Sequence, residues 1–150
     1  MNVLLNAYYR IDSRVTKDDD TLFSVTLLPD CEVYKGHFPG NPISPGVCNI
    51  QMIKECTELL MGKRLFLTFI DKCRFSAVIT PPKSAQATTP LKLQIQLSAT
   101  GGMNETLADT VVGEWQEAIN GEDSALKVRA TLFDDTATYI EFRGEFIEMR

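Results

Sequence analysis

One histidine stands inside an unusually constrained stretch of the sequence. His37 is the only histidine in the chain, and the segment from Tyr34 to Gly46 (YKGHFPGNPISPG) around it holds three prolines and three glycines. An imidazole readily takes or gives a proton near neutral pH. Because each proline fixes φ, we expect a rigid, extended loop without regular secondary structure, which positions His37 for proton transfer.

A helix is predicted to begin where this loop ends, and its first turn offers a second chemical group. Pro45 or Gly46 opens the helix, apolar residues then recur at three- and four-residue spacing to about Met61, and Gly62 occupies the C-cap position. The first N–H groups of a helix have no partner within it, and the helix dipole is positive there. Gly46 is therefore a candidate to bind an oxygen on which negative charge develops.

Residues 36–47 (GHFPGNPISPGV) resemble the GHFPGxPxxPGV signature of the beta-hydroxyacyl-acyl carrier protein dehydratases over twelve contiguous positions. The segment from Ile70 to Pro81 (IDKCRFSAVITP) resembles a strand of the same family, and the likeness extends over roughly residues 20–98. The resemblance implies an α+β hot-dog fold, in which an antiparallel β-sheet wraps around one central α-helix.

The resemblance also implies roles for the residues of the motif. In that family the histidine removes a proton from C2 of a 3-hydroxyacyl thioester, which makes His37 the expected base, and Gly46 would give a backbone N–H to the thioester oxygen. The substrate-binding positions that the motif carries over are Phe38, Pro39, Gly46 and Val47. Family members form dimers with acyl tunnels between subunits, so we expect a homodimer or larger homo-oligomer that binds an acyl carrier protein or acyl thioester.

The chain departs from the family at its acidic position. The catalytic Glu of the family, which acts from the central helix of the neighbouring subunit, falls five residues after the Gly of PGV, where this chain has Gln51. A primary amide has no titratable proton near neutral pH, so we expect Gln51 to orient a hydroxyl or a water rather than act as general acid or base. Candidate replacements are Glu55, about 6 Å further along the helix, and Asp30 and Glu32 beside the loop.

Three functions stay open from the residues alone. The first is a 3-hydroxyacyl-acyl carrier protein dehydratase of fatty-acid or polyene-type lipid biosynthesis, weakened or inactive if the change at Gln51 is not compensated. The second is a catalytically impaired hot-dog protein that binds an acyl carrier protein or acyl thioester, and the third is an acyl-thioester hydrolase. A second departure, Pro82 where the family commonly has Gly, affects the expected tunnel mouth.

Length and charge narrow the class of protein. A chain of 150 residues suits a single domain over 1–150. The net charge of −5 argues against nucleic-acid binding, although residues 35–92 hold eight positive and three negative side chains. Six of these cations form a candidate docking surface for an acidic carrier protein: Lys54, Lys63, Arg64, Lys72, Arg74 and Lys83. No apolar run is long enough to span a membrane, and the first ten residues lack the basic start of a secretory signal, so we expect a cytoplasmic protein without membrane insertion.

The cysteines give no sign of a metal or redox site. Cys31, Cys48, Cys56 and Cys73 lack C-x-x-C spacing and read as small reduced side chains. We expect neither a metal nor a cofactor.

The rest of the chain predicts β-strands around the helix. The expected strands cover residues 8–15, 21–28, 64–79, 91–97, 125–133 and 139–149, the fourth alternating without exception and the last two joined by a turn that opens at Asp134. Residues 100–123 fit a short helix and a strand equally well. A single helix covering one face of a curled antiparallel sheet satisfies this order.

Overall fold

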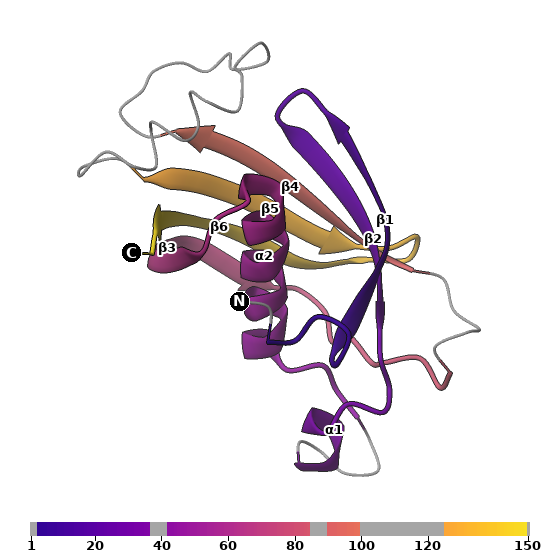
Figure 1. Ribbon diagram of the computed structural model, residues 1–150. Coiled ribbons are helices and arrows are strands. Elements are labelled where there is room, and N and C mark those ends of the chain that lie inside the picture. The colour runs from indigo at the N-terminus through magenta and orange to yellow at the C-terminus, as the bar shows by residue number, and fades with distance from the viewer. Residues whose placement is uncertain (1–2, 37–41, 85–89, 100–124, 150) are drawn as a thin grey trace.

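In the part of the chain that the structure describes, six strands form one antiparallel sheet in the order β1-β2-β4-β5-β6-β3. Their bounds are Tyr9–Lys17 (β1), Asp20–Leu27 (β2), Leu65–Phe75 (β3), Leu91–Ala99 (β4), Leu126–Phe133 (β5) and Thr138–Glu148 (β6). The computed structural model describes residues 3–36, 42–84, 90–99 and 125–149. Within these ranges lie the short helix α1, Val33–Gly36, and the long helix α2, Gly46–Met61 (Figure 1).

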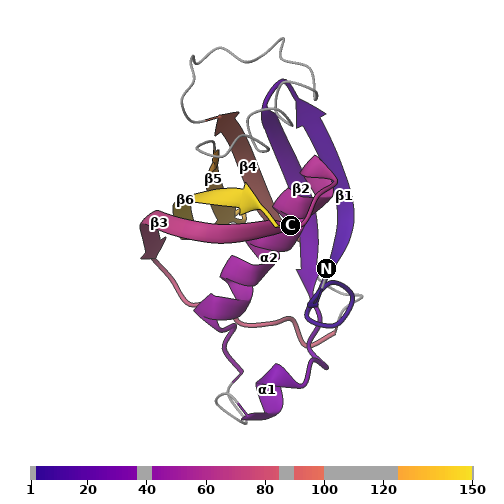
Figure 2. The ribbon, with the colours of Figure 1, turned by 60° about the vertical axis from the view of Figure 1, so that its left-hand side comes forward.

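The sheet curls around α2, with its two edge strands β1 and β3 on opposite sides of the helix (Figure 2). Side chains alternate along each strand, so one face of the sheet is apolar. In β5 this face carries Leu126, Val128, Ala130 and Leu132, which are buried. From α2, Met52, Ile53 and Cys56 are fully buried in the same core. The α+β class and the single central helix that the sequence predicted are confirmed.

Helix α2 begins and ends where its flanking residues predict. Pro45 is the N-cap residue, and Gly62 adopts the left-handed conformation (φ 68°, ψ 26°) at the C-cap, where its N–H donates to Glu58 O at 2.8 Å. The Glu58 carboxylate then accepts the backbone N–H of Leu65 at 2.8 Å, and this bond fixes the start of β3 to the last turn of the helix. No helix among the described residues is long and apolar enough to cross a lipid bilayer.

Strand β3 is bulged, as expected, but shorter than expected. Its register against β6 shifts twice, between Leu67 and Phe69 and between Ile70 and Lys72. The strand was predicted to run to residue 79 but ends at Phe75, and residues 76–84 form no strand. Pro81 and Pro82 have no N–H to donate to a neighbouring strand, so the apolar composition of this segment does not extend the ladder.

The prediction of a loop without regular structure from Tyr34 to Gly46 is wrong for its first residues, which belong to α1. Helix α1 closes there through hydrogen bonds from Tyr34 N to Cys31 O (3.1 Å) and from Lys35 N to Glu32 O (3.0 Å). A proline restricts only itself and the residue before it, so Pro39 leaves residues 33–36 free to turn. The segment 37–41 and the ambiguous segment 100–123 lie outside the described residues.

Candidate active site

Two backbone donors at the start of α2 have no acceptor among the described residues. The Pro45 carbonyl accepts the N–H groups of Cys48 (3.1 Å) and Asn49 (3.2 Å), and no described side chain caps the helix. The N–H groups of Gly46 and Val47 come before these first intrahelical bonds, so the helix itself offers them no acceptor. Val47 is 73% exposed. These two groups are thus placed to bind an oxygen from outside the helix.

A buried polar network holds the residues just before the helix. The Tyr8 and Ser44 hydroxyls lie within hydrogen-bonding distance of each other, and their oxygens lie 2.7 and 2.9 Å from Asn49 Oδ1. Each hydroxyl has one proton, so one of them donates to Asn49 Oδ1 and the other donates either to Asn49 Oδ1 or to the neighbouring hydroxyl. The backbone N–H of Ser44 donates to Ile79 O at 2.7 Å. Burial raises the pKa of Tyr8, so its hydroxyl stays protonated. The network ties the second half of the motif to the chain before β1, to α2 and to the segment after β3, and the sequence analysis did not find it.

Gly46 also contacts a ring from the end of β3. A Cβ atom at this position would lie 2.8 Å from Cζ of Phe75, whose ring rests against the first turn of α2. Because Phe75 is 52% exposed, the tip of its ring can swing aside, so this contact alone does not demand a glycine. The contact brings the last residue of the edge strand β3 beside the start of the helix.

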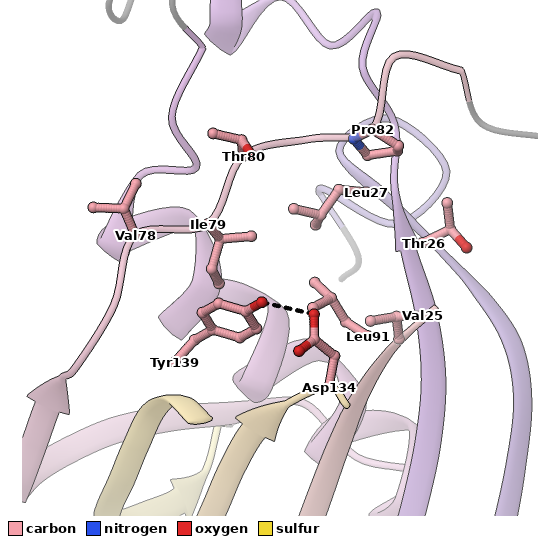
Figure 3. Close-up of a pocket in the computed structure, with 10 residues that line it drawn as sticks. All are labelled: Val25, Thr26, Leu27, Val78, Ile79, Thr80, Pro82, Leu91, Asp134 and Tyr139. Carbon is pink, nitrogen blue, oxygen red and sulfur yellow. Dashed lines mark hydrogen bonds between the residues drawn. The ribbon is translucent and has the colours of Figure 1, made fainter. Parts of the chain in front are cut away.

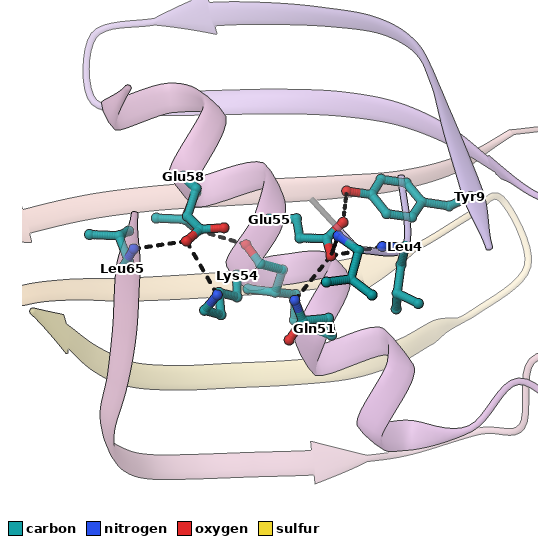
Figure 4. A network of polar contacts seen from close by, with 10 residues as sticks. Leu4, Tyr9, Gln51, Lys54, Glu55, Glu58 and Leu65 are labelled. Carbon is teal, nitrogen blue, oxygen red and sulfur yellow. Dashed lines mark hydrogen bonds and ion pairs between the residues drawn. The ribbon is translucent and has the colours of Figure 1, made fainter. Parts of the chain in front are cut away.

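Gln51 lies one helical turn beyond Val47, on the same side of α2, and is half-buried. Its Nε2 donates to Glu55 Oε2 at 3.0 Å (Figure 4). The structure therefore brings Gly46, Val47 and Gln51 together on the first turns of one helix. The remaining predicted site residues, His37, Phe38 and Pro39, lie outside the described residues.

Glu55 cannot replace the missing acid, because its carboxylate already accepts hydrogen bonds from the chain before β1. Its carboxylate is fully buried and accepts the backbone N–H groups of Val3 (2.8 Å), Leu4 (2.9 Å) and Leu5 (3.1 Å). Burial by itself raises the pKa of Glu55, but the hydrogen bonds from Gln51, from these backbone groups and from the Tyr9 hydroxyl outweigh it and hold the pKa below its ordinary value. Glu55 is therefore ionised at neutral pH and has no proton to donate.

The other two candidate carboxylates face solvent. Asp30 is exposed, and the exposed Glu32 pairs with Lys35 at 3.1 Å in α1. Neither is held by a buried contact, so nothing in the described residues directs them toward the start of α2.

Three of the six candidate docking cations are already paired with carboxylates of the same chain. Lys54 lies 3.2 Å from Glu58, Lys63 lies 3.1 Å from Glu148, and Lys72 lies 3.7 Å from Glu141. The first two lysines are also largely buried along their stems. These pairs reduce the positive charge that the six residues present to an acidic partner.

The cysteines are free thiols, and burial raises the pKa of Cys48, Cys56 and Cys73, so these side chains stay protonated. Within the described ranges no group of three or more His, Cys, Asp or Glu side chains is arranged to hold a metal ion.

A cavity of about 240 Å³ opens beside the segment after β3 (Figure 3). Ile79, whose carbonyl accepts the Ser44 N–H, forms one wall, and Pro82 forms another. Tyr139, which lies below Ile79 in Figure 3, also lines the cavity, and its hydroxyl donates to Asp134 Oδ2 at 2.6 Å. The cavity is smaller than the roughly 300–1,000 Å³ of typical ligand pockets, so it does not by itself accommodate a long acyl chain.

The curated proteins that resemble this chain include 3-hydroxyacyl-[acyl-carrier-protein] dehydratases. The chain is 33% identical over 89 residues to the 3-hydroxyacyl-[acyl-carrier-protein] dehydratase FabZ of Alkaliphilus metalliredigens, which covers 54% of this chain and 56% of that protein. It is 37% identical over 57 residues to FabZ of Lactobacillus helveticus, covering 33% of this chain and 38% of that protein. The chain thus spans only 38% and 56% of the length of these two relatives.

Solved structures share the fold. The Dehydratase Heterocomplex ApeI:P from Xenorhabdus doucetiae superposes with a TM-score of 0.61 at 17% identity, covering 93% of this chain and 97% of that chain. An uncharacterized protein from Erwinia carotovora subsp. atroseptica gives a TM-score of 0.53 at 14% identity, covering 93% and 94%. The family model of the ApeI dehydratases matches residues 13–106, which is more than half of the chain and includes the whole motif. This hot-dog chain therefore belongs to the ApeI-like dehydratase family.

Proposed function

We propose that this protein catalyses the reversible loss of water from a 3-hydroxyacyl thioester, carried by an acyl carrier protein, in fatty-acid or polyene-type lipid biosynthesis. The observation that carries the proposal is the motif of residues 36–47, which leads into the uncapped start of α2 in a chain of the ApeI-like dehydratase family. The matches to the dehydratase FabZ, although partial, support the same substrate class.

The first chemical step is proton removal from C2. His37 accepts the proton as the C2–H bond breaks, and the electron pair moves onto the thioester carbonyl to form an enolate. The N–H groups of Gly46 and Val47, at the positive end of the helix dipole, would bind the oxygen that gains this charge. Val47 also offers an exposed apolar side chain to the acyl chain.

The second step breaks the C3–O bond, and the leaving hydroxide needs a proton. Gln51 has none to give, and Glu55 is ionised. We therefore assign the proton to His37, which carries it from the first step and returns it to the leaving oxygen. The products are the trans-2-enoyl thioester, one water molecule and a neutral imidazole, so one residue serves as base and then as acid.

Turnover and thiol release measured together test this proposal. The purified chain is supplied with 3-hydroxyacyl and trans-2-enoyl thioesters of several chain lengths, on an acyl carrier protein and on coenzyme A. We expect the enoyl absorbance to change without thiol release, with higher kcat/KM for the carrier protein, and His37→Ala to abolish the change. Absence of turnover at every chain length excludes the dehydratase, and thiol release would indicate a hydrolase.

A non-catalytic acyl-binding protein is the second candidate. The specific observation in its favour concerns the three candidate carboxylates: Glu55 is held by buried hydrogen bonds, and Asp30 and Glu32 are exposed, so none of them replaces the acid at Gln51. A pocket that keeps the donors of Gly46 and Val47 but lacks the acid would bind the thioester without converting it. Tight binding in the absence of turnover distinguishes this candidate from the first.

We also propose that two copies pair along β3. This strand is an edge of the sheet, and Phe66, Phe69 and Phe75 on it are each about half exposed. The opposite edge, β1, ends in polar residues from Asp12 to Lys17 with one exposed valine. An edge with free backbone groups and exposed phenylalanines favours addition of a second sheet. Because the solved ApeI:P structure is a heterocomplex, a related subunit rather than a second copy is the alternative partner.

A further inference from the structure

The carboxylate of Glu55 collects five hydrogen-bond donors in the interior of the protein. Oε2 accepts Val3 N, Leu4 N and the side-chain amide of Gln51, and Oε1 accepts Leu5 N and the Tyr9 hydroxyl, at distances of 2.8 to 3.1 Å (Figure 4). The side chain of Glu55 is fully buried. An ionised carboxylate has about four lone-pair sites, so its acceptor capacity is filled.

This environment fixes which end of the Gln51 amide faces Glu55. A carboxylate surrounded by N–H and O–H donors only accepts hydrogen bonds, so the Gln51 atom 3.0 Å away must be the NH₂ nitrogen. Turning the amide around would place its carbonyl oxygen against a negative charge. The Gln51 Oε1 therefore points away from Glu55 (Figure 4), and the half-buried side chain presents an acceptor, not a donor, on its free side.

An acceptor at this position discriminates between acyl thioesters. A 3-hydroxyacyl chain has a hydroxyl that donates to a carbonyl oxygen, whereas a 3-oxoacyl chain has only an acceptor at C3. Had the amide been free to turn, its NH₂ would donate to the 3-oxo group as readily as its oxygen accepts from the hydroxyl, and the two chains would not be distinguished.

We propose that Glu55 is a positioning residue that holds the Gln51 carboxamide with its oxygen toward the substrate, and that the pair makes the site selective for 3-hydroxyacyl over 3-oxoacyl thioesters. The inference rests on the proposed function, because it takes Gln51 to line the acyl site. It assigns to Glu55 a role that the family motif does not contain, since residues 36–47 end before α2 reaches it.

The test is a binding measurement that needs no turnover. Three unreactive pantetheine analogues of equal chain length, in which an amide or thioether replaces the thioester, carry a 3-hydroxyl, a 3-oxo group or a saturated chain. For the natural sequence we expect the hydroxyl analogue to bind about five-fold more tightly, the effect of one neutral hydrogen bond. Gln51→Met, which keeps the length of the side chain without its polar atoms, should bind all three alike.

Variants at Glu55 and Tyr9 separate positioning from support of the fold. Glu55→Gln lets the Gln51 amide turn, so the preference for the hydroxyl over the 3-oxo analogue should fall toward one, although binding persists. Tyr9→Phe removes a donor from Oε1 and leaves the Gln51 bond on Oε2 intact, so this matched variant should lose comparable stability and keep the preference. Thermal melting of both variants checks that they are folded.

The outcomes distinguish this inference from the proposed function. If none of the analogues binds the natural protein, the acyl-thioester function itself falls, and the inference with it. If all three bind equally, or if Gln51→Met keeps the preference, the function stands and the selectivity role is wrong. Should Glu55→Gln fail to fold, NMR of the natural protein decides instead. The side-chain NH₂ resonances of Gln51, assigned by their loss in Gln51→Met, should shift as the Glu55 carboxyl titrates. If these resonances do not shift, Glu55 does not position the Gln51 amide.

Discussion

Gln51 Nε2 and Glu55 Oε2 lie 3.0 Å apart on successive turns of α2, so an amide occupies the place where a second carboxyl would meet an ionised one. Gln51→Glu would create such a pair. Glu55 keeps its four other donors and stays ionised, and its charge raises the pKa of the introduced carboxyl, which then holds a proton near neutral pH. A proton donor would stand where the natural chain has none.

We expect Gln51→Glu to raise kcat for dehydration on the order of 10²-fold, the lower range for a positioned general acid. Because the acid must be protonated to act, the activity of this variant should fall as pH rises through the raised pKa, a limb that the natural chain lacks. A kcat profile between pH 5 and 9 checks this, with Gln51→Met as the uncharged control. A variant that is no faster, or whose profile superposes on that of the natural chain, contradicts the single-residue proton route through His37.

Glu55→Ala should destabilise the protein by about 2 to 4 kcal/mol, since it removes a buried acceptor of charged hydrogen bonds and leaves the N–H groups of Val3, Leu4 and Leu5 without it. Urea unfolding at pH 7 measures the difference. Glu32→Ala, at an exposed surface pair, is the matched control and should change stability by less than about 0.5 kcal/mol. If the two substitutions lower the free energy of unfolding equally, the hydrogen bonds to the Glu55 carboxylate do not stabilise the fold.

The contribution of Glu55 to the free energy of unfolding should also fall as the pH is lowered. The folded-state pKa of Glu55 lies below its ordinary value of 4.5, so its stabilisation is complete above that value and is lost as the pH falls through the folded-state pKa. The difference in unfolding free energy between the natural chain and Glu55→Ala should therefore shrink between pH 5 and pH 3. A difference that stays constant over this range contradicts the assignment.

The elements with local signals could be predicted from the sequence. Pro45 and Gly62 mark the two ends of α2, and the strict alternation from Leu91 to Leu97 marks β4. A proline or a glycine acts on its own neighbourhood, and alternation needs only a few consecutive residues. The twelve-residue motif is likewise contiguous, and for this reason it led to the right family.

The contacts that join distant parts of the chain could not be predicted in the same way. Glu55 lies about fifty residues from the backbone groups that it binds, and Tyr8 lies 36 residues from Ser44. Each is an ordinary polar residue in its own stretch of sequence, and only the fold brings the partners together. This is why Glu55 was a candidate acid in the sequence analysis and is a buried structural anchor in the fold.

Gly144→Ala should destabilise the protein by about 1 to 3 kcal/mol through overpacking. An added Cβ would lie 2.8 Å from the backbone oxygen of Phe69 and 2.8 Å from Cζ of Phe142, and the backbone at the β3 bulge cannot move aside as a side-chain tip can. Gly62→Ala is the control, because no atom lies near the added Cβ. This substitution should cost only the strain of a left-handed alanine, about 1 kcal/mol. If Gly144→Ala is the milder of the two, the close approach of β3 to β6 is not rigid.

Substitution of the exposed phenylalanines of β3 should separate the subunits. Phe66 and Phe69 are 54% and 53% exposed on the edge of the sheet, and a lysine at each position places charge where a second β3 would have to pair. We expect Phe66→Lys with Phe69→Lys to convert a dimer into a monomer in light scattering after size-exclusion chromatography. Val15→Lys introduces a charge at a similarly exposed residue of the opposite edge strand, β1, and should leave the mass unchanged.

The same pair of variants links assembly to chemistry. The cavity beside Ile79 is too small for a long acyl chain, and Phe75 brings the end of β3 against the start of α2, so a second subunit at this edge would enclose the acyl chain beside Gly46. The β3 variant should therefore lose turnover together with its dimeric mass, whereas Val15→Lys keeps both. A monomeric β3 variant that retains full activity would place the acyl chain within one subunit, and a dimeric one would move the interface to another face of the protein.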